Sequence, residues 1–315
     1  MKLSNLSVGQ RIPNYKKLCE LLEEPVKDGN SKKSQQREWK RYFSYDREGN
    51  AYVIKEIFDT AKLSEDGRAS YMRYLEPLLF HYLDESGGSA EHSFKDWSTE
   101  LGMTSSRVYD EDELAVWMAP NQFAPYIVHR TVNEVATKTK EVLLSTVHAL
   151  KKRGQVDFKI NTYIVQNGGH RLASAEEETA IEGVKRLVRE ELGVTSMFSV
   201  NVNFRNKKAF YERVNEIYQE RHGWSSAYTL LRVTATDAAP LHLYEDINVD
   251  ELASNLQDEI QSAIRIKLNN NEKSSAEKNE EAWEQYQAEN DGQKPQFFLS
   301  EMDVHAMEFL LEELM

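Results

Sequence analysis

The chain has 315 residues, 40% of them hydrophobic, and a formal net charge of -13 at pH 7. This length predicts two or three domains, each able to bury a core. The acidity argues against nonspecific coating of nucleic acid, because phosphate neutralisation drives that mode of binding. No apolar run approaches the roughly 20 residues that span a bilayer, and the first residues lack the apolar core of a secretion signal. We therefore expect a cytoplasmic protein with no membrane partner.

Basic residues are concentrated at the start of the chain. Residues 1–62 carry 13 Lys and Arg against 9 Asp and Glu, a net charge of +4, whereas the remaining residues carry 26 against 43, a net charge of -17. A basic module on an acidic body can still bind a duplex, especially when an oligomer presents several modules at once. We expect any nucleic-acid contacts to lie in residues 1–62.

Two short helices are predicted in this basic segment. Asn14 can cap the first helix, Gly29 breaks the chain, and Asn30 or Ser31 can cap a second helix that runs toward Phe43. Three leucines have helical spacing on the first helix: Leu18, Leu21 and Leu22. The one cysteine of the chain, Cys19, lies on this apolar face, so we expect a buried thiol. A single cysteine also excludes an internal disulfide and a Cys-rich zinc site.

A β-hairpin is predicted after the second helix. A turn at residues 46–50 joins a strand ending near Tyr45 to a second strand at residues 51–58, on which Tyr52 and Ile54 share a face; the register stays open. The second helix can pack Trp39 and its neighbours inward while its other face donates hydrogen bonds to phosphates and base edges. The residues expected to contact DNA are Lys32, Lys33, Gln36, Arg37, Lys40, Arg41 and Arg47.

The middle of the chain predicts a second module of the same kind. A helix is expected at residues 70–83, followed at residues 94–109 by two helices around a turn at Gly102, the second capped by Thr104 or Ser105. Residues 110–125 indicate a loop, and a long helix follows from Thr131 to Lys152. Two strands are then expected on either side of Asn161, as a second candidate wing.

The acidic carboxyl-terminal half predicts further α+β structure. Helices are expected at residues 175–192, 207–222 and 249–268, and strands at 197–204 and 228–236. The polar residues 269–296 form either a flexible connector or a solvated helix. A final helix opens at Ser300 and Asp303, and its apolar stripe docks either on its own chain or on a partner.

The residue patterns predict no enzyme. The eight histidines are scattered without metal-ligand spacing, and no nucleophile motif is present, so we expect no metal and no cofactor. The segment GNSKKS lacks the first glycine of a phosphate loop and is interpreted as a helix start. The acidic run at residues 176–178 is interpreted as helix capping rather than as paired acid and base groups.

A family resemblance agrees with this interpretation. The segments NYKKLCELL, GNSKKSQQREWKRY and REGNAYVIKEI resemble the amino-terminal part of proteins from phages and mobile elements of Gram-positive bacteria, which look like tandem winged-helix proteins. The resemblance is close over residues 14–58 and looser as far as residue 167. It implies DNA binding and implies no catalytic residue, and the acidic half departs from it.

We predict a helix-rich α+β protein with tandem winged helix-turn-helix modules and a mixed α/β carboxyl-terminal domain. The expected divisions are residues 1–62, 63–170 and 171–315. The favoured function is a sequence-specific DNA-binding regulator or replication-associated factor that binds double-stranded DNA as a homo-oligomer. The alternative is an anti-defence inhibitor whose acidic surface occupies the nucleic-acid channel of a host defence protein.

Overall fold

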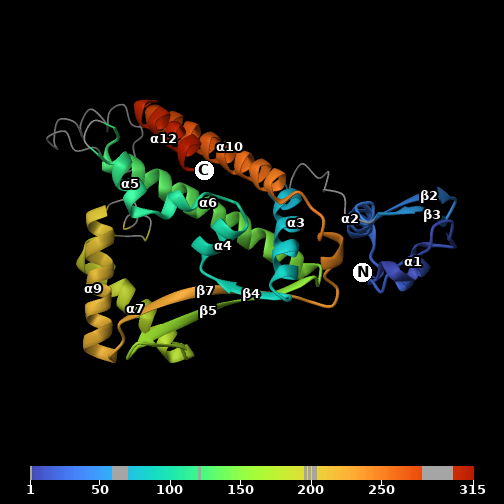
Figure 1. Cartoon of the computed structure of the whole chain (residues 1–315), viewed down its shortest axis with the longest axis horizontal. Coiled ribbons are helices and arrows are strands. Elements are labelled where there is room, and N and C mark those ends of the chain that lie inside the picture. Colours follow the sequence, from blue (N-terminus) through green and yellow to red (C-terminus); the bar gives the residue numbers. More distant parts are fainter. Residues whose placement is uncertain are drawn as a thin grey trace. The chain divides into compact units, whose positions relative to one another are not determined.

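The computed structural model describes residues 2–58, 70–119, 122–194, 197, 200, 204–278 and 301–315. Helices predominate in its mixed α+β fold (Figure 1), which confirms the predicted class. The elements of the basic segment are η1 Leu3–Asn5, β1 Arg11–Ile12, α1 Tyr15–Leu21, α2 Gly29–Trp39, β2 Phe43–Glu48 and β3 Ala51–Ile57.

The elements of the middle segment are α3 Ser70–Glu85, β4 Ser89–His92, α4 Phe94–Glu100, η2 Ser106–Tyr109, α5 Glu111–Trp117 and α6 Pro125–Lys152. The remaining elements are β5 Val156–Gln166, β6 Gly169–Leu172, α7 Ala175–Glu191, α9 Phe204–His222, β7 Ser226–Ala235, η3 Leu241–Leu243, α10 Val249–Lys278 and α12 Glu301–Leu314. The strands form two antiparallel sheets with the orders β1-β3-β2 and β4-β7-β5-β6.

The chain divides into two compact units, each built from three segments. The first unit comprises Met1–Glu91, Val142–Phe158 and Arg232–Leu256, and the second comprises His92–Glu141, Lys159–Leu231 and Gln257–Met315. The three predicted domains have two boundaries. The boundary after residue 62 lies outside the described residues, and the boundary after residue 170 falls inside β6.

Within the first unit, the basic segment has the predicted order of two helices and a hairpin. The Asn14 side chain caps α1 by accepting a hydrogen bond of 2.9 Å from the amide of Lys17, and Cys19 is buried as expected. Helix α2 begins at Gly29, one residue before the first predicted cap, and ends at Trp39 instead of running toward Phe43. It ends early because three successive amides, those of residues 40–42, bond back three residues and turn the chain into β2. Trp39, Tyr42 and Phe43 are all fully buried by this turn.

The hairpin is tighter than predicted. Strand β2 continues to Glu48, so the turn is only Gly49 and Asn50 rather than residues 46–50. Gly49 has φ +63°, which suits the first central position of a two-residue hairpin turn. The register pairs Arg47 with Tyr52, and Tyr52 is buried against the helices.

The predicted second helix-turn-helix is only partly correct. Helix α4 and the left-handed turn at Gly102, with φ +60°, are present, but the expected second helix is the 3-10 turn η2. The predicted loop contains α5, whose N-terminus is capped by the Asp110 carboxylate through the amides of Asp112 and Glu113 at 2.9 and 3.1 Å. Helix α6 begins at Pro125, six residues before the prediction, because proline is favoured in the first turn of a helix.

The second candidate wing at Asn161 is wrong. Residues 156–166 form one continuous strand, β5, and Asn161 is buried within it. The hairpin turn lies after the end of β5, where Asn167 and Gly168 have φ +52° and +76° and join β5 to β6. This Asn-Gly pair has the two positive φ angles of a type I′ turn, which is the strongest short hairpin signal in a sequence.

One core of the second unit lies where β5 packs against α7 and α9. Its buried residues are Ile164, Ile181, Val184, Val188, Val200, Phe210, Val214, Ile217, Tyr218 and Trp224. Helix α7 begins with a capping box between Ser174 and Glu177, which explains its acidic first turn as predicted. Most of the strand predicted at residues 197–204 lies outside the described residues, but Met197 and Val200 are described and are helical.

The carboxyl-terminal helix docks on its own chain. Helix α12 lies along α10 (Figure 1), where Gln261 donates to the Leu311 carbonyl at 3.4 Å and Arg265 pairs with Glu312 at 2.7 Å. The stripe that α12 buries is Val304, Met307, Leu310, Leu311 and Leu314. Helix α10 continues past residue 268 into the predicted connector; Ser300 and residues 279–296 lie outside the described residues. No described helix has both the length and the apolarity to cross a bilayer.

Candidate nucleic-acid interface

The inner face of α2 is held by a partly buried polar clamp. A single carboxylate oxygen of Glu24 accepts hydrogen bonds from the Gln35 amide at 2.6 Å and from the Trp39 indole nitrogen at 2.8 Å. The Tyr15 hydroxyl also bonds to the Gln35 side chain, and burial raises the pKa of Tyr15 to about 12, so the hydroxyl stays protonated near neutral pH. The clamp fixes the rotation of α2 about its own axis.

The outer face of α2 forms a shallow, open concavity of about 400 Å³ together with β2. Its helical residues have offsets of three, four and seven positions, which place their side chains on one face of a helix. The lining residues are Lys33, Gln36, Arg37, Lys40, Tyr45 and Arg47. Five of the seven residues predicted to contact DNA therefore lie on one surface, brought together from a helix and a strand.

Strand alternation separates the charges of β2. Tyr45 and Arg47 are two residues apart and share the face that borders the concavity, whereas the carboxylates of Asp46 and Glu48, which alternate with them, point to the other face. Those carboxylates are engaged in two exposed ion pairs, Asp46–Lys55 at 3.1 Å and Glu48–Arg11 at 3.2 Å. The described lining residues thus include four cationic side chains and no carboxylate.

A buried tyrosine joins the two elements under the concavity. The Gln36 amide donates a hydrogen bond of 2.5 Å to the Tyr52 hydroxyl, and the Arg47 guanidinium lies 5.2 Å from the centre of the Tyr52 ring. The Tyr45 ring lies 5.1 Å from the same ring, and burial raises the pKa of Tyr45. Tyr45 was not among the residues predicted to contact DNA, although its alternation with Arg47 on one strand is a signal that could have found it.

The other two predicted residues lie elsewhere. The Lys32 ammonium sits 4.3 Å from the centre of the Tyr15 ring, as a cation–π contact next to the clamp. Arg41 is only 5% exposed and forms an ion pair of 2.7 Å with Glu76, so its guanidinium is not presented at the surface. The expectation that Arg41 contacts DNA is corrected on this ground, because a buried, paired guanidinium cannot reach a phosphate without breaking its own ion pair.

The one carboxylate of α2, Glu38, is turned away from the concavity. It accepts hydrogen bonds from Arg41 at 2.8 Å, from the Tyr42 hydroxyl at 3.2 Å and from Arg153 at 3.3 Å. Among the described residues, the concavity is therefore lined by cations of α2 and by no carboxylate of that helix. Lysine, arginine and glutamine donors in a concave setting are suited to phosphate oxygens and to base edges.

No family model, curated protein or solved structure matches this chain. In the described part of the chain, no group of three His, Cys, Asp or Glu side chains is placed to hold a metal ion. A function is therefore inferred from the residues of the concavity.

Proposed function

We propose that residues 2–58 form a winged helix-turn-helix module that binds double-stranded DNA. In this proposal α2 is the helix that enters the major groove and the β2-β3 hairpin is the wing. The chain acts as a regulator or a replication-associated factor, and a homo-oligomer presents two modules to half-sites about one helical turn apart.

The observation that carries the proposal is the composition of the concavity. Its described lining residues are four cations, one amide and one tyrosine, and the nearby acids Asp46, Glu48 and Glu38 are paired on other faces. A surface of this kind attracts phosphate at close range even though the whole chain has a net charge of -13. The proposal is confined to the first module, because the second lacks the wing predicted at Asn161.

The test is duplex binding by the full-length protein carrying Lys33→Ala and Arg37→Ala together. Affinity for a pool of random-sequence duplexes is measured by fluorescence anisotropy at several salt concentrations. This affinity should be lower in the double variant than in the wild type. The slope of log affinity against log salt should decrease by about one to two, because each side chain neutralises about one phosphate.

The matched control is Lys16→Ala with Lys27→Ala. Both lysines are exposed, belong to the same basic segment and lie outside the lining of the concavity. The control changes the net charge by the same amount. Because its two lysines lie outside the concavity, it should reduce affinity much less. Equal losses in both double variants would show that only the total charge matters and would refute a specific interface.

The competing function is inhibition of a host nucleic-acid-processing protein, which the net charge of -17 over residues 63–315 favours. Capture from nuclease-treated host lysate, together with duplex selection from random sequence, separates the two functions. A stoichiometric basic host enzyme and no enriched duplex would support inhibition, whereas an enriched duplex would support DNA recognition, since base contacts or DNA shape are needed for enrichment.

A further inference from the structure

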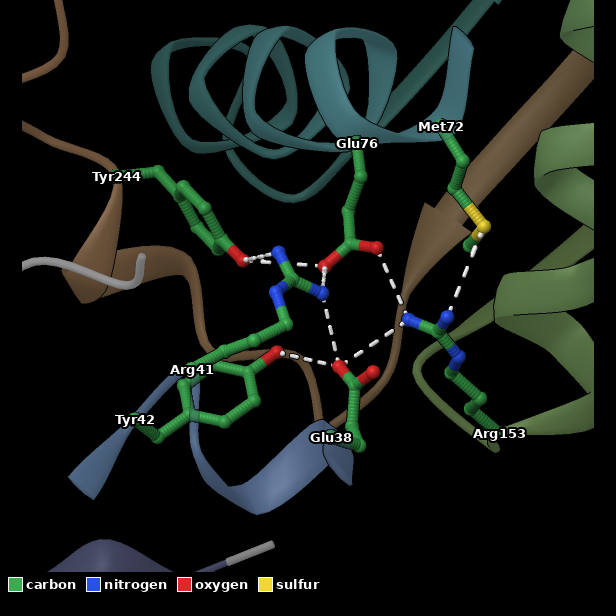
Figure 2. Close-up of polar contacts among 7 residues, drawn as sticks. All are labelled: Glu38, Arg41, Tyr42, Met72, Glu76, Arg153 and Tyr244. Atoms are coloured by element: carbon green, nitrogen blue, oxygen red, sulfur yellow. Dashed lines mark hydrogen bonds and ion pairs between the residues drawn. The ribbon is translucent and has the colours of Figure 1, made fainter. Parts of the chain in front are cut away.

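An ion-pair cluster with a buried centre lies at the carboxyl-terminal end of α2 (Figure 2). The Arg41 guanidinium bonds to Glu76 of α3 at 2.7 Å and to the Tyr244 hydroxyl at 3.3 Å, and Arg153 bonds to the other oxygen of Glu76 at 2.9 Å. The Tyr244 hydroxyl itself donates to Glu76 at 3.1 Å. Glu76 is therefore the residue on which the cluster converges.

The cluster is balanced in charge, and the Arg41–Glu76 pair at its centre is buried, whereas the side chains of Glu38 and Arg153 are 24% and 32% exposed. Two carboxylates, Glu38 and Glu76, face two guanidiniums, Arg41 and Arg153, and Glu76 is only 1% exposed. Burial by itself lowers the pKa of Arg41, but attraction to Glu76 and its neighbours outweighs it and keeps the guanidinium charged. Buried ion pairs contribute little net stability but permit few alternative geometries, since any displacement leaves a charge unpaired.

The cluster is directly continuous with the concavity. Arg41 follows Lys40, and the amides of both residues bond back to Arg37 and Glu38 at the end of α2, at 3.2 and 3.1 Å. Arg37 and Lys40 line the concavity, while Glu38 between them belongs to the cluster. A shift of Arg41 must therefore move the last turn of α2 together with two of the four lining cations.

We propose that Glu76 is a positioning residue for DNA binding: through Arg41 it holds the last turn of α2 on α3, so that Arg37 and Lys40 engage phosphates at the same time as Lys33 and Arg47. This inference rests on the proposed function. It assigns to Glu76 and Arg41 a role without any contact to DNA, and it makes the orientation of α2 depend on residues that are far apart in the sequence.

The test compares three full-length variants at a temperature at which all remain folded by circular dichroism. Glu76→Gln removes one charge, and Arg41→Gln with Glu76→Gln restores neutrality by leaving the Glu38–Arg153 pair. The control, Glu134→Gln, alters another buried carboxylate, which pairs with Lys267 at 2.6 Å in the second unit. Affinity for the random-sequence duplex pool and its salt slope are measured, and amide hydrogen exchange is followed over residues 37–44.

Glu76→Gln should bind the duplex pool about tenfold more weakly, with the salt slope smaller by about one. Exchange over residues 37–44 should accelerate, and Glu134→Gln should leave all three readouts unchanged. The double variant should be more stable than Glu76→Gln because it has no unpaired buried charge, yet its duplex affinity should stay low. A merely structural role for Glu76 predicts that affinity recovers together with stability.

Wild-type affinity in folded Glu76→Gln, or recovery of affinity in the double variant, would overturn this inference and leave the proposed function intact. If the wild-type protein binds no duplex, the proposed function fails. Hydrogen exchange then tests the positioning alone: unchanged exchange over residues 37–44 in Glu76→Gln would overturn it as well.

Discussion

The side-chain amide of Gln36 donates a hydrogen bond of 2.5 Å to the hydroxyl of Tyr52, which links the outer face of α2 to the start of β3. Tyr52 is fully buried and pairs across the hairpin with Arg47, so this bond sets the separation between the helical and the strand cations of the concavity. The helix and the hairpin therefore form one recognition surface.

Removing this bond should weaken the module without unfolding it. Tyr52→Phe keeps the aromatic packing and deletes only the acceptor, so the free energy of unfolding should fall by about 0.5–1.5 kcal/mol. A double-mutant cycle with Gln36→Ala, measured by urea denaturation, isolates the pairwise contribution. Strictly additive losses in the cycle would mean that the bond contributes nothing to stability.

Glu177 should make the stability of the second unit depend on pH. The Arg171 guanidinium bonds to both carboxylate oxygens, at 2.6 and 2.8 Å, and together with the amide of Ser174 it lowers the pKa of Glu177 from 4.5 to about 2. A lowered pKa stabilises the folded state above pH 4.5, and this contribution disappears as the pH falls toward 2.

The measurement is thermal unfolding of wild type and Glu177→Gln from neutral pH down to about pH 2, the lowered pKa of Glu177. The variant should be less stable at neutral pH, and the two melting curves should converge at the acidic end. Glu178→Gln is the matched control, because it removes an exposed charge from the same first turn of α7. An offset for Glu177→Gln that does not vary with pH would contradict the assigned cause.

The α12 helix should contribute stability within the chain itself. Leu311 is fully buried, so Leu311→Ala should lower the free energy of unfolding by about 2–5 kcal/mol through lost burial and a residual cavity. Met302, which is 81% exposed at the start of the same helix, is the control, and Met302→Ala should change stability by less than about 0.5 kcal/mol. Equal stabilities for the two variants in denaturant titrations would imply that α12 is not docked in solution.

Many elements were predictable because their signals are local. Asn14 caps α1, Gly154 follows α6 with a positive φ, and the capping box of α7 lies within four consecutive residues. The spacing of Lys33, Arg37 and Lys40 on one helical face follows from the period of the α-helix. Two missed elements also had local signals: the Asp110 cap of α5 and the Asn167-Gly168 turn after β5.

Other features depend on residues that the fold brings from far away. Arg37 and Arg41 occupy one basic run and are indistinguishable by pattern, yet one lines an open concavity while the other is buried against Glu76, Arg153 and Tyr244. Asn161, a turn former by propensity, lies inside β5, because burial within a sheet overrides local preference. Local propensities act over a few residues and set where helices and turns begin, whereas the environment of a charge depends on which distant carboxylate is packed against it.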